Sequence, residues 1–209
     1  MNSRFCLYAR ITTIAGITLF LAACQQVSQS IKDTFNTLPE EQATAQTSGN
    51  GRIVGFVDDS QALAQAEESL RSLPQYQNTS IYLYGDIHFY DDGRIYAQLQ
   101  HPEKPEYIDT YSYGNGTWSG PEPVQLSVYD DLESKLVALD SVPFSTVATV
   151  ARHYNEKAAT VAGAGDTNHI YLIIRYGITM WYPQQIDGTR ESWHIYFRRD
   201  GSIATFKRN

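Results

Sequence analysis

Asp86 and His88 are the residues whose types and spacing come nearest to a metal site. Residues two apart on a strand point to the same face, so this carboxylate and this imidazole are expected to project together. His101 joins them only if the next strand returns in the right register. Because two ligands do not make a site, we interpret Asp86 and His88 as the solvated face of a half-buried strand. Ile87 and Phe89 then point inward.

Nucleophilic catalysis has no recognisable signature in the chain. The sequence holds five histidines but no Gly-x-Ser-x-Gly elbow that would present a serine to one of them. The segment 163–166, Gly-Ala-Gly-Asp, follows a predicted helix, whereas a phosphate-binding loop precedes one. We therefore assign no catalytic residue, no metal ligand and no cofactor.

Aromatic residues are dense in the segments that read as strands, and the chain has 15 Tyr, 8 Phe and 3 Trp. Strand alternation cannot direct all of these rings into a core. Tyrosine offers a large contact area at low entropic cost, which suits a binding surface for protein or glycan. The alternative is that tyrosine simply favours strands. We predict that Tyr111, Tyr113 and Trp118, which flank the 114–116 Gly-Asn-Gly turn, bind a partner.

The elements that carry these residues are predicted to occur in the same order twice. A short strand at 52–58 precedes a helix that Asp59 or Ser60 caps, and a meander of about four antiparallel strands follows to Gly120. A connecting helix is predicted over 129–139, and a second helix has the apolar stripe Val147, Val150, Ala151 and Tyr154. The rest of the chain is predicted as strands. The fold class is therefore α+β, in two similar modules that each pack a helix on an antiparallel meander, at 52–127 and 128–209.

The duplicated element order resembles the tandem modules of the PepSY and beta-lactamase-inhibitor-like group. Residues 88–95 and 196–203 also share Phe, Asp-Gly and Ile at equal spacing. The resemblance covers about 52–209 and implies binding or inhibition more than catalysis.

The amino terminus is predicted to be an export signal. A basic head that ends at Arg10 precedes an uncharged stretch at 11–21, which is too short to span a bilayer. The following Ala22-Ala23-Cys24 resembles the lipobox of bacterial lipoproteins. The resemblance implies that residues 1–23 are removed and that Cys24 is acylated with fatty chains such as palmitate. Residues 24–51 are then the acylated cysteine and a flexible tether.

Charge and cysteine content narrow the possible partners. The formal net charge of -7 disfavours nucleic acid, and with Cys6 in the signal and Cys24 acylated, the body carries no thiol or disulfide. The lipoprotein resemblance implies that Gln25, in place of Asp, directs the protein to the outer membrane of a Gram-negative cell, with the body in the periplasm or at the surface. Besides the membrane, the expected partner is a protein or envelope component, while the oligomeric state stays open.

Three functions are compatible with these observations. We favour a membrane-anchored, exported protein with a non-catalytic binding role that uses an aromatic sheet face. A rival is a hydrolase or metal-dependent envelope enzyme that uses Asp86 and His88. A third is a structural envelope lipoprotein whose anchor and fold matter more than any ligand.

Overall fold

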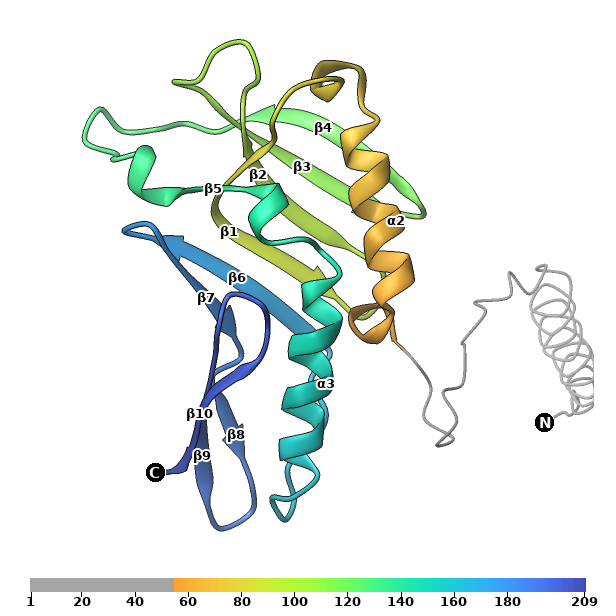
Figure 1. The fold of residues 1–209 in the computed structure, drawn as a ribbon, viewed down its shortest axis with the longest axis vertical. Helices are drawn as coiled ribbons and strands as arrows, with labels where there is room; N and C mark the ends of the chain where they lie inside the picture. The colour runs from red at the N-terminus through yellow and green to blue at the C-terminus, as the bar shows by residue number, and fades with distance from the viewer. Residues whose placement is uncertain (1–54) are drawn as a thin grey trace, which may run out of the picture. The chain divides into compact units, whose positions relative to one another are not determined.

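The computed structural model describes residues 55–209, so the predicted signal, Cys24 and tether lie outside the described residues (Figure 1). The first long helix, α2 (Ser60–Arg71), begins where the sequence predicts. The Asp59 carboxylate accepts hydrogen bonds from the backbone N–H groups of Gln61 and Ala62, which satisfies two donors that the helix itself leaves unpaired. The apolar stripe of α2 is buried, with Leu63, Ala66 and Leu70 fully covered.

The four-stranded meander is confirmed. Each of its strands pairs antiparallel with the next, and the outermost, β4, is exposed along most of its length and contains Pro121 and Pro123. Gly93, with φ of 88°, forms the tight turn after the first strand, where its N–H donates to the carbonyl oxygen of Tyr90. The strands are β1 (Tyr82–Tyr90), β2 (Ile95–Gln100), β3 (Ile108–Gly114) and β4 (Thr117–Pro123).

The second long helix, α3 (Thr146–Ala158), is also confirmed, and its predicted stripe is buried. A β-rich region follows it, as the sequence indicates. The turn between its first two strands is formed by Tyr176 and Gly177. These strands are β6 (His169–Arg175), β7 (Ile178–Tyr182), β8 (Gln185–Asp187), β9 (Ser192–Phe197) and β10 (Ile203–Arg208).

The predicted strand at 52–58 is wrong where the structure describes it. Phe56–Asp58 forms a short 3-10 helix, η1. Among residues 55–209, no strand pairs with this segment. Instead, both main-chain and side-chain oxygens of Asp91 accept hydrogen bonds from the segment, from the N–H groups of Phe56 and Val57 respectively. Helix α2 begins at Ser60, directly after its cap Asp59, so no extended segment separates η1 from α2.

The predicted helix at 129–139 is wrong as well. The chain instead forms a 3-10 turn η3 (Glu133–Lys135), the short strand β5 (Leu136–Ala138) and a second 3-10 turn η4 (Leu139–Ser141). β5 pairs antiparallel with the first residues of β1. The edge of β1 thus offers hydrogen-bond partners that helical spacing of leucines cannot reveal, and tertiary pairing overrides local propensity.

Strands from both halves of the chain form one sheet. The order is β4-β3-β2-β1-β6-β7, with β5 also paired to β1, and β10-β9-β8 form a separate three-stranded sheet. The junction is the antiparallel pairing of Asp86–Tyr90 in β1 with His169–Ile173 in β6. The mixed α+β class with antiparallel pairing is therefore confirmed, and the segments 52–127 and 128–209 contribute to a common sheet.

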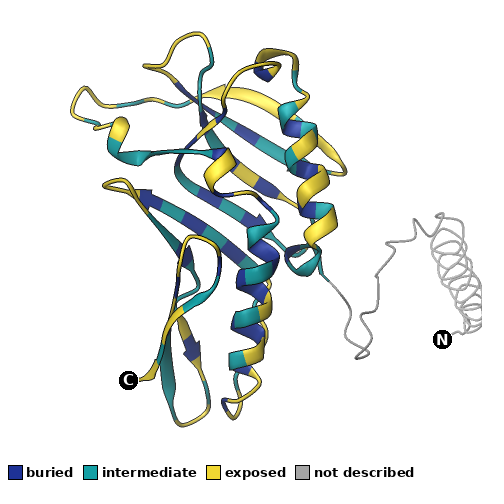
Figure 2. Ribbon diagram, in the orientation of Figure 1, coloured by how far each residue is buried: buried dark blue, intermediate teal, exposed yellow. Residues whose placement is uncertain are grey.

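Both long helices lie on the same face of this sheet (Figure 1). The core between the helices and the sheet takes the inward side chains of β1 and β6, including Ile87, Phe89 and Leu172. Figure 2 shows buried segments on both the helices and the sheet. Among residues 55–209, no helix combines the length and apolar character that crossing a membrane requires.

Glu67 of α2 connects this helix to the segment that leads into α3. One carboxylate oxygen accepts a hydrogen bond from the backbone N–H of buried Phe144 at 2.7 Å, and the other accepts from the Arg71 guanidinium at 2.7 Å. The Arg71 guanidinium also pairs with Asp140 at 2.8 Å. Loss of the Glu67 carboxylate therefore leaves the buried Phe144 N–H without an acceptor, and it also breaks the ion pair with Arg71.

We predict that Glu67→Ala lowers the free energy of unfolding by about 1–3 kcal/mol, the usual result of leaving a buried donor unsatisfied. Urea denaturation measures the effect. Glu68→Ala is the matched control, since Glu68 is exposed on the same helix and its loss should change stability by less than about 0.5 kcal/mol. Equal stability of the two variants would contradict the assigned role of Glu67.

Candidate functional site

A row of four rings crosses the sheet on the face opposite the helices. Tyr96 of β2 lies opposite His88 of β1, His88 lies opposite Tyr171 of β6, and Tyr171 lies opposite Tyr182 of β7. We call Tyr96, His88, Tyr171 and Tyr182 the ring row. The His88 and Tyr171 rings stack with centroids 5.2 Å apart, and the Tyr171 and Tyr182 rings stack at 4.8 Å. The row joins strands from both halves of the chain.

Alternation along β1 and β6 places the ring row on this face. Ile87 and Phe89 are buried in the core, so the side chains between and beside them project to the other side. The same parity applies to Tyr171, whose neighbours Ile170 and Leu172 are buried. His88, Tyr171 and Tyr182 are half-buried because the rings cover one another, while Tyr96 is 38% exposed.

A second pair of rings lies beside the row. Tyr90 and His169 are directly opposite each other, and their rings are nearly parallel with centroids 4.3 Å apart. The Arg94 guanidinium lies over the outer ring, 4.8 Å from the centroid of Tyr90, which is a cation–π contact. The face thus presents ring edges, hydroxyls and imidazole nitrogens in a fixed array.

The two imidazoles are in direct contact. His88 Nδ1 lies 3.1 Å from His169 Nε2, so one nitrogen donates and the other accepts. Burial lowers the pKa of both histidines, and for His169 the nearby His88 lowers it further, while Asp86 partly offsets the effect at His88. The pair is therefore held with at least one ring neutral, because two imidazoliums cannot share this hydrogen bond.

The row continues toward the second, three-stranded sheet. A hollow of about 460 Å³ is lined by Tyr171 and Tyr182 on one side and by His194 and Tyr196 of β9 on the other. Tyr196 is 36% exposed. Ring side chains consequently line the open face from β2 across to β9.

The structure places the predicted pair Asp86 and His88 on one face, where His88 also contacts His169. Asp86 and His88 occupy the open face of β1 with Ile87 and Phe89 buried, as the half-buried strand interpretation requires. His101 serves elsewhere, because its Nδ1 accepts hydrogen bonds from the N–H groups of Glu103 and Lys104. Within residues 55–209, no cluster of three or more His, Cys, Asp or Glu side chains is placed to hold a metal ion.

Sequence reasoning missed His169, which contacts His88 from 81 positions away. The sequence does show that His169 and Tyr171 alternate with the apolar residues Ile170 and Leu172, which is the pattern of a half-buried strand. That pattern gives the face on which His169 lies but not the strand that β6 pairs with.

The three predicted partner-binding residues lie on the helix side of the sheet. Tyr111 is 2% exposed and meets the Tyr76 ring edge-on. Tyr113 stacks on Phe56, and the Trp118 indole donates to the carbonyl oxygen of Ala66 in α2 at 2.9 Å. These contacts give all three residues a packing role, while their binding of a partner stays a prediction.

Comparison with known proteins adds no relative from which a function could be transferred. No protein-family model matches the chain, and no significant match was found among curated proteins or solved structures. The residues themselves carry the functional argument.

The imidazole pair predicts a pH-dependent stability. Both folded-state pKa values lie below the ordinary 6.5, so the unfolded chain binds more protons as the solution is acidified. The stabilisation is complete above about pH 6.5 and is lost as pH falls through the folded pKa values. We expect the free energy of unfolding, measured by urea denaturation, to decrease between about pH 7 and about pH 5.

His169→Phe should reduce this dependence, because it keeps a ring in the stack and removes one titrating group. Tyr90→Phe, which alters the neighbouring ring without removing an imidazole, is the control and should retain the parental slope. The interpretation fails if His169→Phe and the parent lose stability equally on acidification.

Proposed function

We propose that the chain is an exported, lipid-anchored protein with a non-catalytic role in binding a protein or another envelope component. The support for the anchor is Ala22-Ala23-Cys24, which follows a basic head and an apolar stretch. Two or three acyl chains on Cys24 hold a protein on a membrane far longer than one chain does. Gln25 supports the outer membrane of a Gram-negative cell as the location, with the body in the periplasm or at the surface.

The tether sets how far the body reaches from its anchor. Residues 25–51 are rich in Gln, Thr, Ser and Asn, a composition that favours a flexible coil with an end-to-end distance of about 30 Å. A binding face carried at this distance meets components that lie beyond the lipid headgroups.

The single observation that supports a binding role is the ring row on the face that neither long helix covers. The His88, Tyr171 and Tyr182 rings are already stacked, and Tyr96 packs edge-on against Tyr90, so docking these rings costs little side-chain entropy. Within residues 55–209, the hydroxyls of Tyr171 and Tyr182 form no hydrogen bond, so they offer a partner directional hydrogen bonds as well as apolar contact, whereas His88 Nδ1 is already engaged by His169 Nε2. This preorganised array is better suited to recognition than to bond chemistry.

Element spacing supports the two-module interpretation of the fold. The helices α2 and α3 begin at residues 60 and 146, and the strands β4 and β10 begin at 117 and 203, an offset of 86 in both cases. The match of residues 88–95 with 196–203 has an offset of 108 and does not belong to this alignment. The strands β1 and β6, which begin at 82 and 169, pair antiparallel, as two copies related by a two-fold axis would. We infer an internal duplication with this pairing at its centre.

The anchor is tested by metabolic palmitate labelling. We expect the parent chain to incorporate label and to fractionate with the membrane, and Cys24→Ser to lose both properties. Cys6→Ser is the control, because Cys6 lies within the predicted signal and should leave labelling unchanged. An unlabelled parent chain would remove the proposed location.

The binding face is tested by site-specific photocrosslinking in intact cells. A photoreactive residue in place of Tyr96 should form discrete adducts, whereas one at Tyr107, which is 52% exposed but outside the ring row, should not. Tyr182→Ala in the same chain should reduce the adducts at position 96, because it removes the opposite end of the face that the partner would contact. Adducts of the same pattern from both positions would argue against a specific face.

A further inference from the structure

A cavity of about 570 Å³ opens where β1 changes its pairing partner, and Gly85 lies at that point. Tyr82–Tyr84 pair with β5, whereas Asp86–Tyr90 pair with β6, so the two partner strands meet β1 on either side of Gly85. The β1–β2 ladder is also irregular between Tyr84 and His88, and Gly85 has φ of 63°. Such an irregularity bends a strand and re-aims its side chains. The cavity is thus a consequence of the sheet's topology, and its volume is that of an ordinary ligand site.

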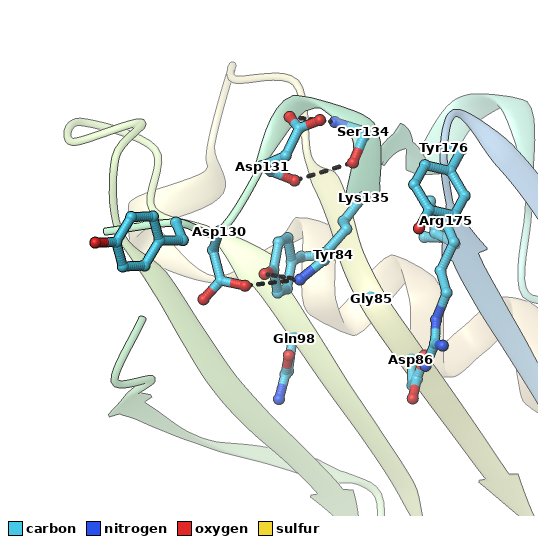
Figure 3. A pocket seen from close by; sticks show the side chains of 12 residues that line it. Tyr84, Gly85, Asp86, Gln98, Asp130, Asp131, Ser134, Lys135, Arg175 and Tyr176 are labelled. Carbon is cyan, nitrogen blue, oxygen red and sulfur yellow. Dashed lines mark hydrogen bonds and ion pairs between the residues drawn. The ribbon is translucent and has the colours of Figure 1, made fainter. Parts of the chain in front are cut away.

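One wall of the cavity is fixed by internal bonds. Lys135 Nζ donates to the Asp130 carboxylate at 2.9 Å and to the Tyr84 hydroxyl at 3.3 Å, and the Ser134 N–H donates to the Asp131 carboxylate at 3.2 Å (Figure 3). The Asp130 pKa is lowered by its bond to Lys135. These groups hold the 130–135 segment in place and are already engaged with one another.

Three other polar side chains line the cavity without a hydrogen bond or ion pair of this kind among the described residues. In the part of the chain that the structure describes, Asp86, Gln98 and Arg175 form no side-chain hydrogen bond or ion pair. They project into the same hollow, with Arg175 extended toward Asp86 (Figure 3). Together they offer a carboxylate acceptor, an amide that both donates and accepts, and a guanidinium with five donors.

Two tyrosines complete the lining with rings that lie almost wholly in solvent. Tyr129 is 93% exposed and Tyr176 is 85% exposed, and within residues 55–209 neither ring packs on another aromatic ring. Tyr176 adopts φ of 54° and Gly177 φ of 70°, the left-handed values that the two-residue hairpin turn between β6 and β7 requires, and Tyr176 is a bulky residue at a turn position that favours Asn, Asp or Gly. The next residue, Gly177, donates its N–H to the carbonyl oxygen of Ser134 at 2.8 Å, which ties this turn to the opposite wall.

We propose that this cavity binds a neutral oligosaccharide, an inference that concerns a site separate from the ring row and goes beyond the proposed function. Sugar hydroxyls both donate and accept, which matches the mixed set of Asp86, Gln98 and Arg175, and the C–H faces of a pyranose match uncovered tyrosine rings. A purely anionic ligand would meet the carboxylate of Asp86. A purely cationic ligand would meet the guanidinium of Arg175.

The test is saturation-transfer NMR and calorimetry on the full mature chain in detergent, with pentamers of α- and β-linked glucose and tetramers of N-acetylglucosamine at millimolar concentration. Saturable binding of at least one oligosaccharide is expected. Tyr176→Gly should weaken it about tenfold, the equivalent of about 1.4 kcal/mol of lost contact. Tyr176→Gly also relieves the left-handed strain, so its melting temperature should equal or exceed that of the parent, and loss of binding cannot be ascribed to unfolding.

Gln98→Ala should weaken binding to a similar extent, and Tyr107→Ala, outside the cavity, should leave it unchanged. The inference is overturned if no oligosaccharide binds, if Tyr176→Gly and Gln98→Ala bind as the parent does, or if a short zwitterionic peptide binds in place of the sugars. Photocrosslinking from Tyr96 keeps the two proposals separate. Adducts without sugar binding remove only this inference, and sugar binding without adducts removes only the ring-row function.

Discussion

The antiparallel pairing of β1 with β6 is the constraint on which the remaining structure depends. It joins residues about eighty positions apart and sets the parity of both strands at once, so that Ile87 and Leu172 enter one core while His88 and Tyr171 share the opposite face. A slip of one residue would exchange these faces. The ring row, the imidazole pair and the change of partner at Gly85 all follow from this one register.

The helices and the meander could be predicted because their signals are local. Asp59 precedes an apolar stripe of helical period, Val147 and Val150 begin a second one, and the strands before and after Gly93 alternate around a tight turn. In each case propensity, capping and burial agree, which is the situation in which sequence specifies structure most reliably.

The strand β5 and the contacts of the candidate site could not be predicted, because they depend on contacts between distant segments. Leu132, Leu136 and Leu139 have helical spacing, yet the edge of β1 draws Leu136–Ala138 into a strand. Likewise Asp86 and His88 were visible as a possible pair, but His169 was not, since only the β1–β6 register places it within 3.1 Å of His88. The rings at 111, 113 and 118 show the same limit: their types suggested a surface, but Trp118 packs against α2, Tyr111 against Tyr76 and Tyr113 against Phe56.

The edge strand β4 affects how readily copies of the chain could associate through their sheets. Pro121 and Pro123 in β4 have no backbone N–H to offer, and Glu122 between them carries a charge. Such an edge disfavours the addition of a strand from a neighbouring molecule, which is the pairing that builds fibrils. Under the proposed lipid anchoring, copies of the chain would meet on one membrane surface, and this edge would disfavour their self-association through β4.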